Sequence, residues 1–291
     1  SLSQKGGFIK MIRIGIIGTE NSHAMGFAKL INVSGRYPRL KVVSLYGEDP
    51  QASLKVQQEC GVETIAPNPQ AMLGQIDALM VTSRDGALHA KYAAPFLKAG
   101  IPAFIDKPFT RDCAEARELV SLAEASGAKI MGGSGVKFVP DVLALREFAQ
   151  QNAPIGGHVW APVSMENEYG NFYFYCAHLV ESCMMIFGYD PVSVSAHRNE
   201  KGVSAVVRYP SFDVHLSFLD NIYHYGASVL TAAGAMSKEI NIDGFTELLL
   251  QRFAAMLESG TLPQPYHDLI SPVDLMVAIH KSFSAHREQL L

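Results

Sequence analysis

The stretch that decides the fold is Arg13-Ile14-Gly15-Ile16-Ile17-Gly18-Thr19-Glu20-Asn21-Ser22-His23. The apolar run Ile12–Ile17 predicts a buried β-strand, and Ala24–Val33 predicts a helix. Gly18 provides the tight turn between them. Such a turn aims backbone N–H groups and the positive end of the helix at one point. The stretch therefore predicts a turn that suits a phosphate group.

The same alternation of apolar runs and helical segments continues to about residue 131. Further strands are predicted at Leu40–Tyr46, Val62–Ile65, Ala78–Thr82, Ala103–Ile105 and Lys129–Met131. Helices are predicted between them at Pro50–Cys60, Pro69–Leu73, Leu88–Lys98 and Cys113–Ser126. Apolar strands that are separated by helices indicate a parallel sheet covered on both faces. Right-handed crossovers make such a sheet doubly wound.

The pattern changes near Gly135, where we place a domain boundary. Helices are predicted at Asp141–Gln150 and Cys176–Phe187, and strands at His158–Met165, Val192–His197, Val203–Tyr209, Val214–Leu219 and Ala227–Ala232. Because the last four strands follow one another without a long helix, they predict an open, mostly antiparallel sheet. Two helices close the chain, and Ser271 is the expected N-cap of the second, with Pro272 at its first position. This gives an α+β domain over residues 135–291 after an α/β domain over residues 11–134.

Composition narrows the function classes. The chain has 291 residues, of which 48% are hydrophobic and 18% charged, and its net charge is −4 without a basic run, so nucleic acid and acidic membrane surfaces are poor partners. No apolar stretch approaches the roughly 20 residues that cross a bilayer, and no signal pattern is visible, so we expect a cytoplasmic protein. The four cysteines form no CxxC pair, and no HExxH or paired ligand spacing predicts a metal site.

The predicted phosphate turn departs from the usual G-x-G-x-x-G pattern. Gly18 fits the first position, Glu20 occupies the second and His23 the third. A carboxylate 4 Å from a phosphate charge costs about 4 kcal/mol at an effective dielectric constant of 20. Glu20 must therefore point away or be paired, or no dinucleotide binds in the usual pose. The alternative is that Glu20 only favours the start of a helix whose N-cap is Asn21 or Ser22.

Other candidates follow the ends of the predicted strands, where open α/β sheets bind ligands. Glu48 follows the second strand and could bind ribose hydroxyls, which favours NAD over NADP, although it also suits a solvated turn. Arg84 follows Thr82 and Ser83 and could hold a phosphate or a substrate carboxylate, whereas His89 at a helix start is more often structural.

Asp106, Lys107 and Pro108 follow the strand Ala103–Ile105. The proline holds the lysine in a fixed direction, and partial burial can lower the pKa of a lysine into a range that is useful for proton transfer. This strand-end position makes Lys107 a candidate catalytic residue.

In their order along the chain, these segments resemble the Gfo/Idh/MocA oxidoreductases. Asp106-Lys107-Pro108 is similar to the Glu-Lys-Pro motif of that family, and His178-Leu179-Val180-Glu181 is similar to its His-x-x-Asp helix. The resemblance implies a Rossmann domain that binds NAD or NADP, a substrate domain whose sheet forms a homo-oligomer, and hydride transfer to or from a sugar, cyclitol or related polyol. It implies that Lys107 orients substrate and assists proton transfer, that His178 is an acid/base, and that the Lys107–Pro108 bond is cis.

The cofactor contacts implied by the turn, the strand ends and the resemblance together are Gly18, Thr19, Glu20, Asn21, Ser22, His23, Glu48, Thr82, Ser83, Arg84, His89, Asp106 and Lys107. On its helix, His178 shares a face with Glu181, which could orient the imidazole, although His178 could also only cap or pack.

One departure concerns the acid that the family usually carries four residues before the histidine. Phe174 stands there, within the aromatic cluster Tyr169, Phe172, Tyr173, Phe174 and Tyr175. A phenylalanine cannot take a proton, so Tyr173, Tyr175, Glu166 or Glu168 is a possible substitute. The second hypothesis is therefore a ligand-sensing protein of the same fold without catalysis. Metal-dependent hydrolysis or isomerisation is a third and weaker hypothesis.

Overall fold

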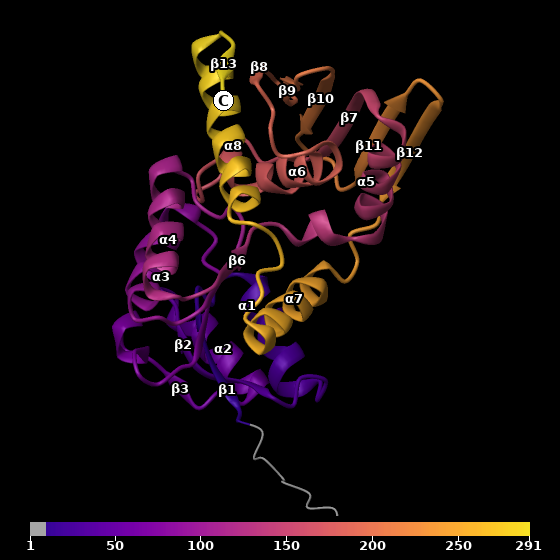
Figure 1. Cartoon of the computed structure of the whole chain (residues 1–291). Coiled ribbons are helices and arrows are strands. Elements are labelled where there is room, and N and C mark those ends of the chain that lie inside the picture. Colours follow the sequence, from indigo (N-terminus) through magenta and orange to yellow (C-terminus); the bar gives the residue numbers. More distant parts are fainter. Residues whose placement is uncertain (1–9) are drawn as a thin grey trace, which may run out of the picture.

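The computed structural model describes residues 10–291 (Figure 1), and the first part of the chain forms a six-stranded parallel sheet. Its strands are β1 (Ile12–Ile17), β2 (Leu40–Tyr46), β3 (Thr64–Ile65), β4 (Ala78–Val81), β5 (Ala103–Ile105) and β6 (Ile130–Gly132). Their order is β3-β2-β1-β4-β5-β6, with Ile14 of β1 paired to Val42 on one side and Ala78 on the other. This order confirms the doubly wound sheet and places its switch point beside β1, where such sheets bind ligands.

Short polar residues begin three of the four α-helices of this part. The helices are α1 (Ser22–Ala28), α2 (Pro50–Cys60), α3 (His89–Lys98) and α4 (Cys113–Ser126), with short turns η2 (Pro69–Met72) and η3 (Gly86–Leu88). The side chains of Asp49 and Asp112 accept backbone N–H groups at the starts of α2 and α4, which end at left-handed glycines. The single helix expected over 24–33 is α1 followed by a π-helical turn, η1 (Lys29–Val33).

The second part of the chain is built on a seven-stranded sheet. Its strands are β7 (Pro154–Pro162), β8 (Ser193–Asn199), β9 (Gly202–Arg208), β10 (Asp213–Leu219), β11 (Tyr225–Thr231), β12 (Gly234–Ile240) and β13 (Gln289–Leu290), in the order β12-β11-β7-β10-β9-β8-β13. Only the pair β7 and β10 is parallel, which confirms a mostly antiparallel sheet. Strands β12 and β13 were not predicted, because β12 carries Ser237, Lys238 and Glu239 and is recognisable only through its pairing with β11.

The helices α5 (Pro140–Asn152), α6 (Phe172–Phe187) and α8 (His267–Ala285) pack beside this sheet (Figure 1). The prediction that the last helix begins at Ser271 is wrong. Ile270 N donates to the carbonyl of Tyr266, so a helical turn forms before Ser271 and Pro272 lies inside the helix. None of the described helices is long and apolar enough to cross a membrane.

Helix α7 (Phe245–Ser259) lies away from the second sheet and packs against α1 and η4 (Gly135–Phe138), as Figure 1 shows. Phe253 of α7 contacts Phe104 of β5 with ring centroids 6.1 Å apart, and Phe104 contacts Phe27 of α1 at 5.2 Å. All three rings are buried. Since such rings bury large apolar areas, this stack holds the second half of the chain against α1 and β5 of the first sheet.

Candidate active site

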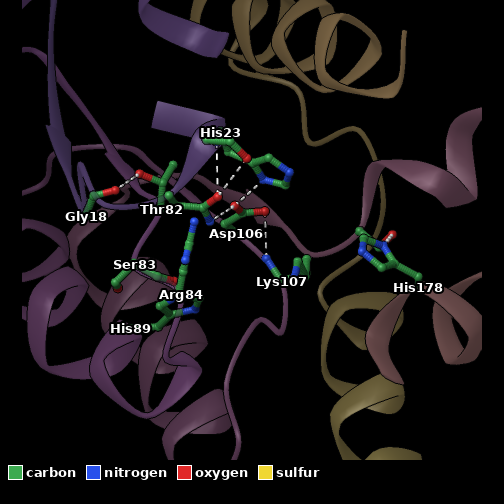
Figure 2. A network of polar contacts seen from close by, with 12 residues as sticks. Gly18, His23, Thr82, Ser83, Arg84, His89, Asp106, Lys107 and His178 are labelled. Atoms are coloured by element: carbon green, nitrogen blue, oxygen red, sulfur yellow. Dashed lines mark hydrogen bonds and ion pairs between the residues drawn. The ribbon is translucent and has the colours of Figure 1, made fainter. Parts of the chain in front are cut away.

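A cavity of about 360 Å³ lies at the carboxyl ends of β4 and β5, where the second half of the chain covers the first sheet. Its lining residues are Asn21, Ser22, His23, Arg84, Lys107, Val136, Tyr169, Phe174, Tyr175, His178, Tyr225, Ile242 and Phe245. Arg84 follows β4 and Lys107 follows β5, and Figure 2 shows His178 across from them. The two residues that the sequence marks as catalytic, Lys107 and His178, thus face one cavity.

The turn after β1 has a shape that only glycine allows. Gly18 has φ +100°, and a Cβ atom there would lie 2.1 Å from the backbone nitrogen of Ser83. Thr82 Oγ1 donates to the carbonyls of Ile17 and Gly18 at 3.2 and 3.0 Å, which fixes the end of β1 against β4. Asn21 caps α1 by accepting the N–H of His23 at 3.1 Å, so Asn21 is the N-cap.

Glu20 turns across this loop toward β4. Its carboxylate accepts the backbone N–H of Arg84 at 3.1 Å. Behind it, Glu48 accepts the hydroxyl of Tyr92 at 2.8 Å, and burial together with the charge of Glu48 raises the pKa of Tyr92. The hollow that Glu20, Glu48 and Tyr92 share with Gly18 measures only about 10 Å³.

The donors around that hollow have the chemistry that a diphosphate requires. Ser83 Oγ is buried and, within residues 10–291, has no hydrogen-bond partner. The N–H of Arg84 already binds an anion, the carboxylate of Glu20. Thr19 does not add a donor, because its hydroxyl bonds Ser53 Oγ at 2.7 Å. The residues therefore fit a dinucleotide when the Glu20 side chain turns away from Arg84.

Asp106 and His23 form a close pair beneath the cavity. Asp106 Oδ2 lies 2.6 Å from His23 Nδ1 and 3.5 Å from the Asn21 amide nitrogen, and Asp106 Oδ1 accepts the N–H of Lys107 at 2.8 Å. Burial opposes ionisation of Asp106, but His23 and Lys107 outweigh it and lower the pKa of the carboxyl. His89 is also buried, and both its ring nitrogens face backbone carbonyls, so we interpret it as a support for the loop of Ser83.

Lys107 is held at the mouth of the cavity by its backbone and by aromatic rings. Its bond to Pro108 is cis, as the resemblance implied. Its Nζ donates to the carbonyl of Phe174 at 2.9 Å and lies 4.3 and 4.7 Å from the ring centroids of Phe174 and Tyr175. Burial lowers the pKa of Lys107. The charge of Arg84 lowers this pKa further, whereas the carboxylate of Asp106 raises it by less than burial lowers it. A lysine in this setting releases its proton more readily than one in water.

The hypothesis that Glu181 orients His178 is wrong. His178 Nδ1 bonds the hydroxyl of Ser134 at 2.7 Å, whereas Glu181 accepts Ser134 N–H at 2.8 Å and binds Lys137 Nζ at 2.7 Å in a buried ion pair. Glu181 therefore holds the loop after β6, and Ser134 on that loop positions the imidazole. Burial lowers the pKa of His178 well below its usual value, and the Lys107 charge acts in the same direction.

Among the proposed substitutes for the missing acid, Tyr175 alone lines the cavity. Its ring centroid lies 5.6 Å from that of His178. Tyr173 is held instead under the Arg111 guanidinium at 5.3 Å, and Glu166 and Glu168 are exposed elsewhere. The position that the family fills with an acid is therefore aromatic in this chain.

The sequence reading missed Ser134, Tyr225 and Phe245, which also shape the site. Ser134 follows β6 at the same sheet edge as Lys107, so the rule that marked Lys107 could have found it. Tyr225 is the first residue of β11, and Phe245 is the first residue of α7. They line the cavity only because the second half of the chain folds over the first sheet, and no local pattern predicts this. Across residues 10–291, no group of three or more His, Cys, Asp or Glu side chains could hold a metal ion.

Residues 12–134 match the family model described as an oxidoreductase family with an NAD-binding Rossmann fold. The match to this Gfo/Idh/MocA model covers the Rossmann domain of the chain. It is 30% identical over 106 residues to a protein of Amycolatopsis mediterranei (strain S699) named "Putative UDP-kanosamine synthase oxidoreductase subunit". The match covers 36% of this chain and 29% of that protein, so the chain spans under a third of its curated relative.

Several solved structures share the whole fold. Scyllo-inositol dehydrogenase from Lactobacillus casei superposes with a TM-score of 0.82 and 16% identity over 98% of this chain and 99% of its own. Myo-inositol 2-dehydrogenase from Lactobacillus plantarum gives a TM-score of 0.82 and 14% identity over 97% and 100%. GenD2 from gentamicin A biosynthesis, solved in complex with NAD, gives a TM-score of 0.84 and 12% identity. The superposition covers 100% of this chain and 99% of GenD2. At such identities the likeness shows the fold alone.

Proposed function

We propose that the chain is a NAD-dependent oxidoreductase that acts on the carbinol carbon of a sugar, cyclitol or related polyol. The observation that carries the proposal is the shared cavity of Lys107 and His178, which lies beside the Gly18 turn at the ligand-binding edge of the sheet. The inositol dehydrogenases with the same fold support this substrate class. NAD is favoured over NADP because Glu48, behind the second strand, would repel a 2′-phosphate.

The dinucleotide would lie along the Gly18 turn, with Ser83 donating to its diphosphate. When bound, its nicotinamide accepts or returns a hydride at the substrate carbon. Lys107 Nζ would donate to the substrate oxygen and stabilise negative charge there. His178 has a pKa well below its usual value, so it is neutral near pH 7 and can take the hydroxyl proton. Ser134 keeps the imidazole in place from the side away from the cavity.

The test is substrate-dependent reduction of NAD across a panel of sugars and cyclitols, repeated with Lys107→Ala. We expect kcat/KM to fall by about 10² to 10⁴, the usual contribution of a positioned proton-transfer group. Turnover that is unchanged in the variant would remove Lys107 from the mechanism. His267→Ala is the control, because His267 lies outside the cavity and its imidazole is exposed.

A ligand-sensing protein without catalysis is the second candidate function. Glu20 in the phosphate turn and Phe174 in place of the acid favour it. Calorimetry with NAD and NADP separates the two candidates, because a folded chain that binds neither dinucleotide supports the sensing protein. A micromolar NAD signal counts against it.

We also propose that the exposed face of the second sheet joins copies of the chain into a homo-oligomer. His197 and His215 are exposed there, and with Leu230 and neighbouring strands they line a broad, shallow hollow of about 680 Å³. Multi-angle light scattering of the purified chain tests this, and replacing the exposed Leu230 by aspartate is expected to shift the mass toward the monomer. A monomeric mass for the unmodified chain would refute it.

A further inference from the structure

The cavity is lined by two cationic side chains and by no carboxylate. Arg84 and Lys107 are its charged residues, and five of its other members are aromatic: Tyr169, Phe174, Tyr175, Tyr225 and Phe245. The nearest acid, Asp106, has no exposed surface and already binds His23 and the N–H of Lys107. The walls of the cavity therefore present positive charge to whatever enters it.

Neither cation of the cavity forms an ion pair with a described residue, and Lys107 Nζ already donates to the carbonyl of Phe174. One nitrogen of Arg84 donates to Tyr169 Oη at 3.2 Å, and the guanidinium carbon lies 5.3 Å from the centre of the same ring. None of the ion pairs within residues 10–291 includes Arg84, whereas nearby Arg111 binds Asp85 at 2.8 Å. A guanidinium carries five N–H donors in a planar fork that matches a carboxylate, so most of the donors of Arg84 remain free.

The Arg84 side chain faces the cavity of Lys107 and His178, whose wall also includes Asn21, Ser22 and His23 after the Gly18 turn. It lines the 360 Å³ cavity with Lys107 and Tyr169, and it is not among the residues of the small hollow beside Gly18, Glu20 and Glu48. Only its backbone N–H points to that hollow, through Glu20. The guanidinium is therefore better placed for the substrate than for the diphosphate.

Position 174 carries a phenylalanine where the family usually has an acid, so no carboxylate there repels an anionic ligand. The centroid of the Phe174 ring lies 4.3 Å from Lys107 Nζ and 5.0 Å from the ring of Tyr169, so it forms the part of the wall beside these two residues. A carboxylate at that position would pair with Lys107 and repel an anionic ligand. With phenylalanine there, the positive charges of the cavity are free for a ligand, and its aromatic walls suit the carbon skeleton of that ligand.

We propose that the substrate is a hydroxy acid, whose carboxylate pairs with Arg84 while its carbinol carbon lies toward Lys107 and His178. This inference rests on the proposed function and names its substrate class. In the oxidation the carbinol C–H bond breaks and its electron pair leaves as hydride to NAD⁺. The hydroxyl proton goes to His178 and on to solvent, and a C=O bond forms. The products are the oxo acid, NADH and one proton.

The test compares binding of matched ligands by calorimetry, with gluconate and glucuronate as acids, glucitol and glucose as their neutral counterparts, and glucose 6-phosphate as a phosphate. We expect the acids to bind at least tenfold more tightly than the neutral compounds. Arg84→Gln should weaken the acids by about 10- to 100-fold, as for a lost hydrogen bond to a charged group, and leave NAD affinity within twofold. Arg84→Lys should retain part of the preference.

Arg146→Gln is the matched control, because Arg146 is exposed on α5 and its loss changes the net charge equally. Two results with the unmodified chain would each overturn the proposal: equal binding of neutral and acidic ligands, or tighter binding of glucose 6-phosphate than of the acids. An equal loss of NAD affinity and acid affinity in Arg84→Gln would also overturn it. If the acids bind as expected but NAD is never reduced, the proposed function fails and the ligand class stands.

Discussion

Removing the charge of Glu20 is expected to raise the affinity of the chain for NAD. The Glu20 carboxylate spans the hollow beside Gly18 by accepting the N–H of Arg84 at 3.1 Å, and about 10 Å³ remains there. Glu20→Gln keeps an oxygen for that N–H and removes the charge. Glu20→Gly removes both the charge and the side chain and completes the second glycine of the phosphate-binding pattern.

The size of the effect follows from the charge and the burial of this side chain. A carboxylate 4 Å from a phosphate charge costs about 1 kcal/mol in water and about 4 kcal/mol at an effective dielectric constant of 20. Glu20 is half-buried, so the cost lies between these limits. Because about 1.4 kcal/mol is tenfold in affinity, Glu20→Gln should strengthen NAD binding by roughly 5- to 1000-fold.

The assay is calorimetric titration with NAD, with thermal unfolding as the check that each variant is folded. Glu118→Gln is the control, because Glu118 is exposed on α4 and its loss changes the net charge equally. A gain in Glu20→Gly alone would assign the effect to the space that the side chain fills. If neither variant binds NAD more tightly than the unmodified chain, the diphosphate does not lie beside Glu20 and the reasoning is refuted.

Three further predictions concern the stability of the residues that build the site. Gly18→Ala should lower the free energy of unfolding far more than the control Gly61→Ala, because a Cβ atom at Gly61 meets no neighbour. The control should cost about 1–2 kcal/mol for its left-handed backbone alone. Equal melting temperatures for the two variants would contradict the close approach at Gly18. Glu181→Gln leaves the charge of Lys137 buried and should cost about 3–5 kcal/mol in urea unfolding, much of it recovered by adding Lys137→Met. Because the folded chain holds the pKa of His178 below that of the unfolded chain, the unfolded state binds more protons below about pH 6.5. Stability should therefore fall as pH drops from 6.5, and His178→Gln should flatten that fall in urea titrations at each pH.

Much of the fold could be predicted because it depends on patterns that are local in the chain. Apolar strands that alternate with helices define the doubly wound sheet, and Gly18 marks its ligand-binding turn. The rule that strand ends meet at one edge then brings Arg84 and Lys107 together. The strand β12 and the start of α8 could not be predicted in this way, because no residue pattern shows the hydrogen bonds on which they depend. Strand β12 depends on its pairing with β11, and the start of α8 depends on the turn that Ile270 N–H closes at the carbonyl of Tyr266.

The sequence by itself determined the two sheets and the shared sheet edge of Lys107 and the Gly18 turn, because backbone geometry restricts these to a few arrangements. The place of His178 beside them was implied by the family resemblance. Only the tertiary structure decided where side chains point. Glu20 reaches a residue 64 positions away, and Glu181 binds Lys137 and leaves His178 to Ser134. The physical reason is that such contacts depend on which donors and charges packing brings within about 3 Å of each other, and segments distant in the chain supply them.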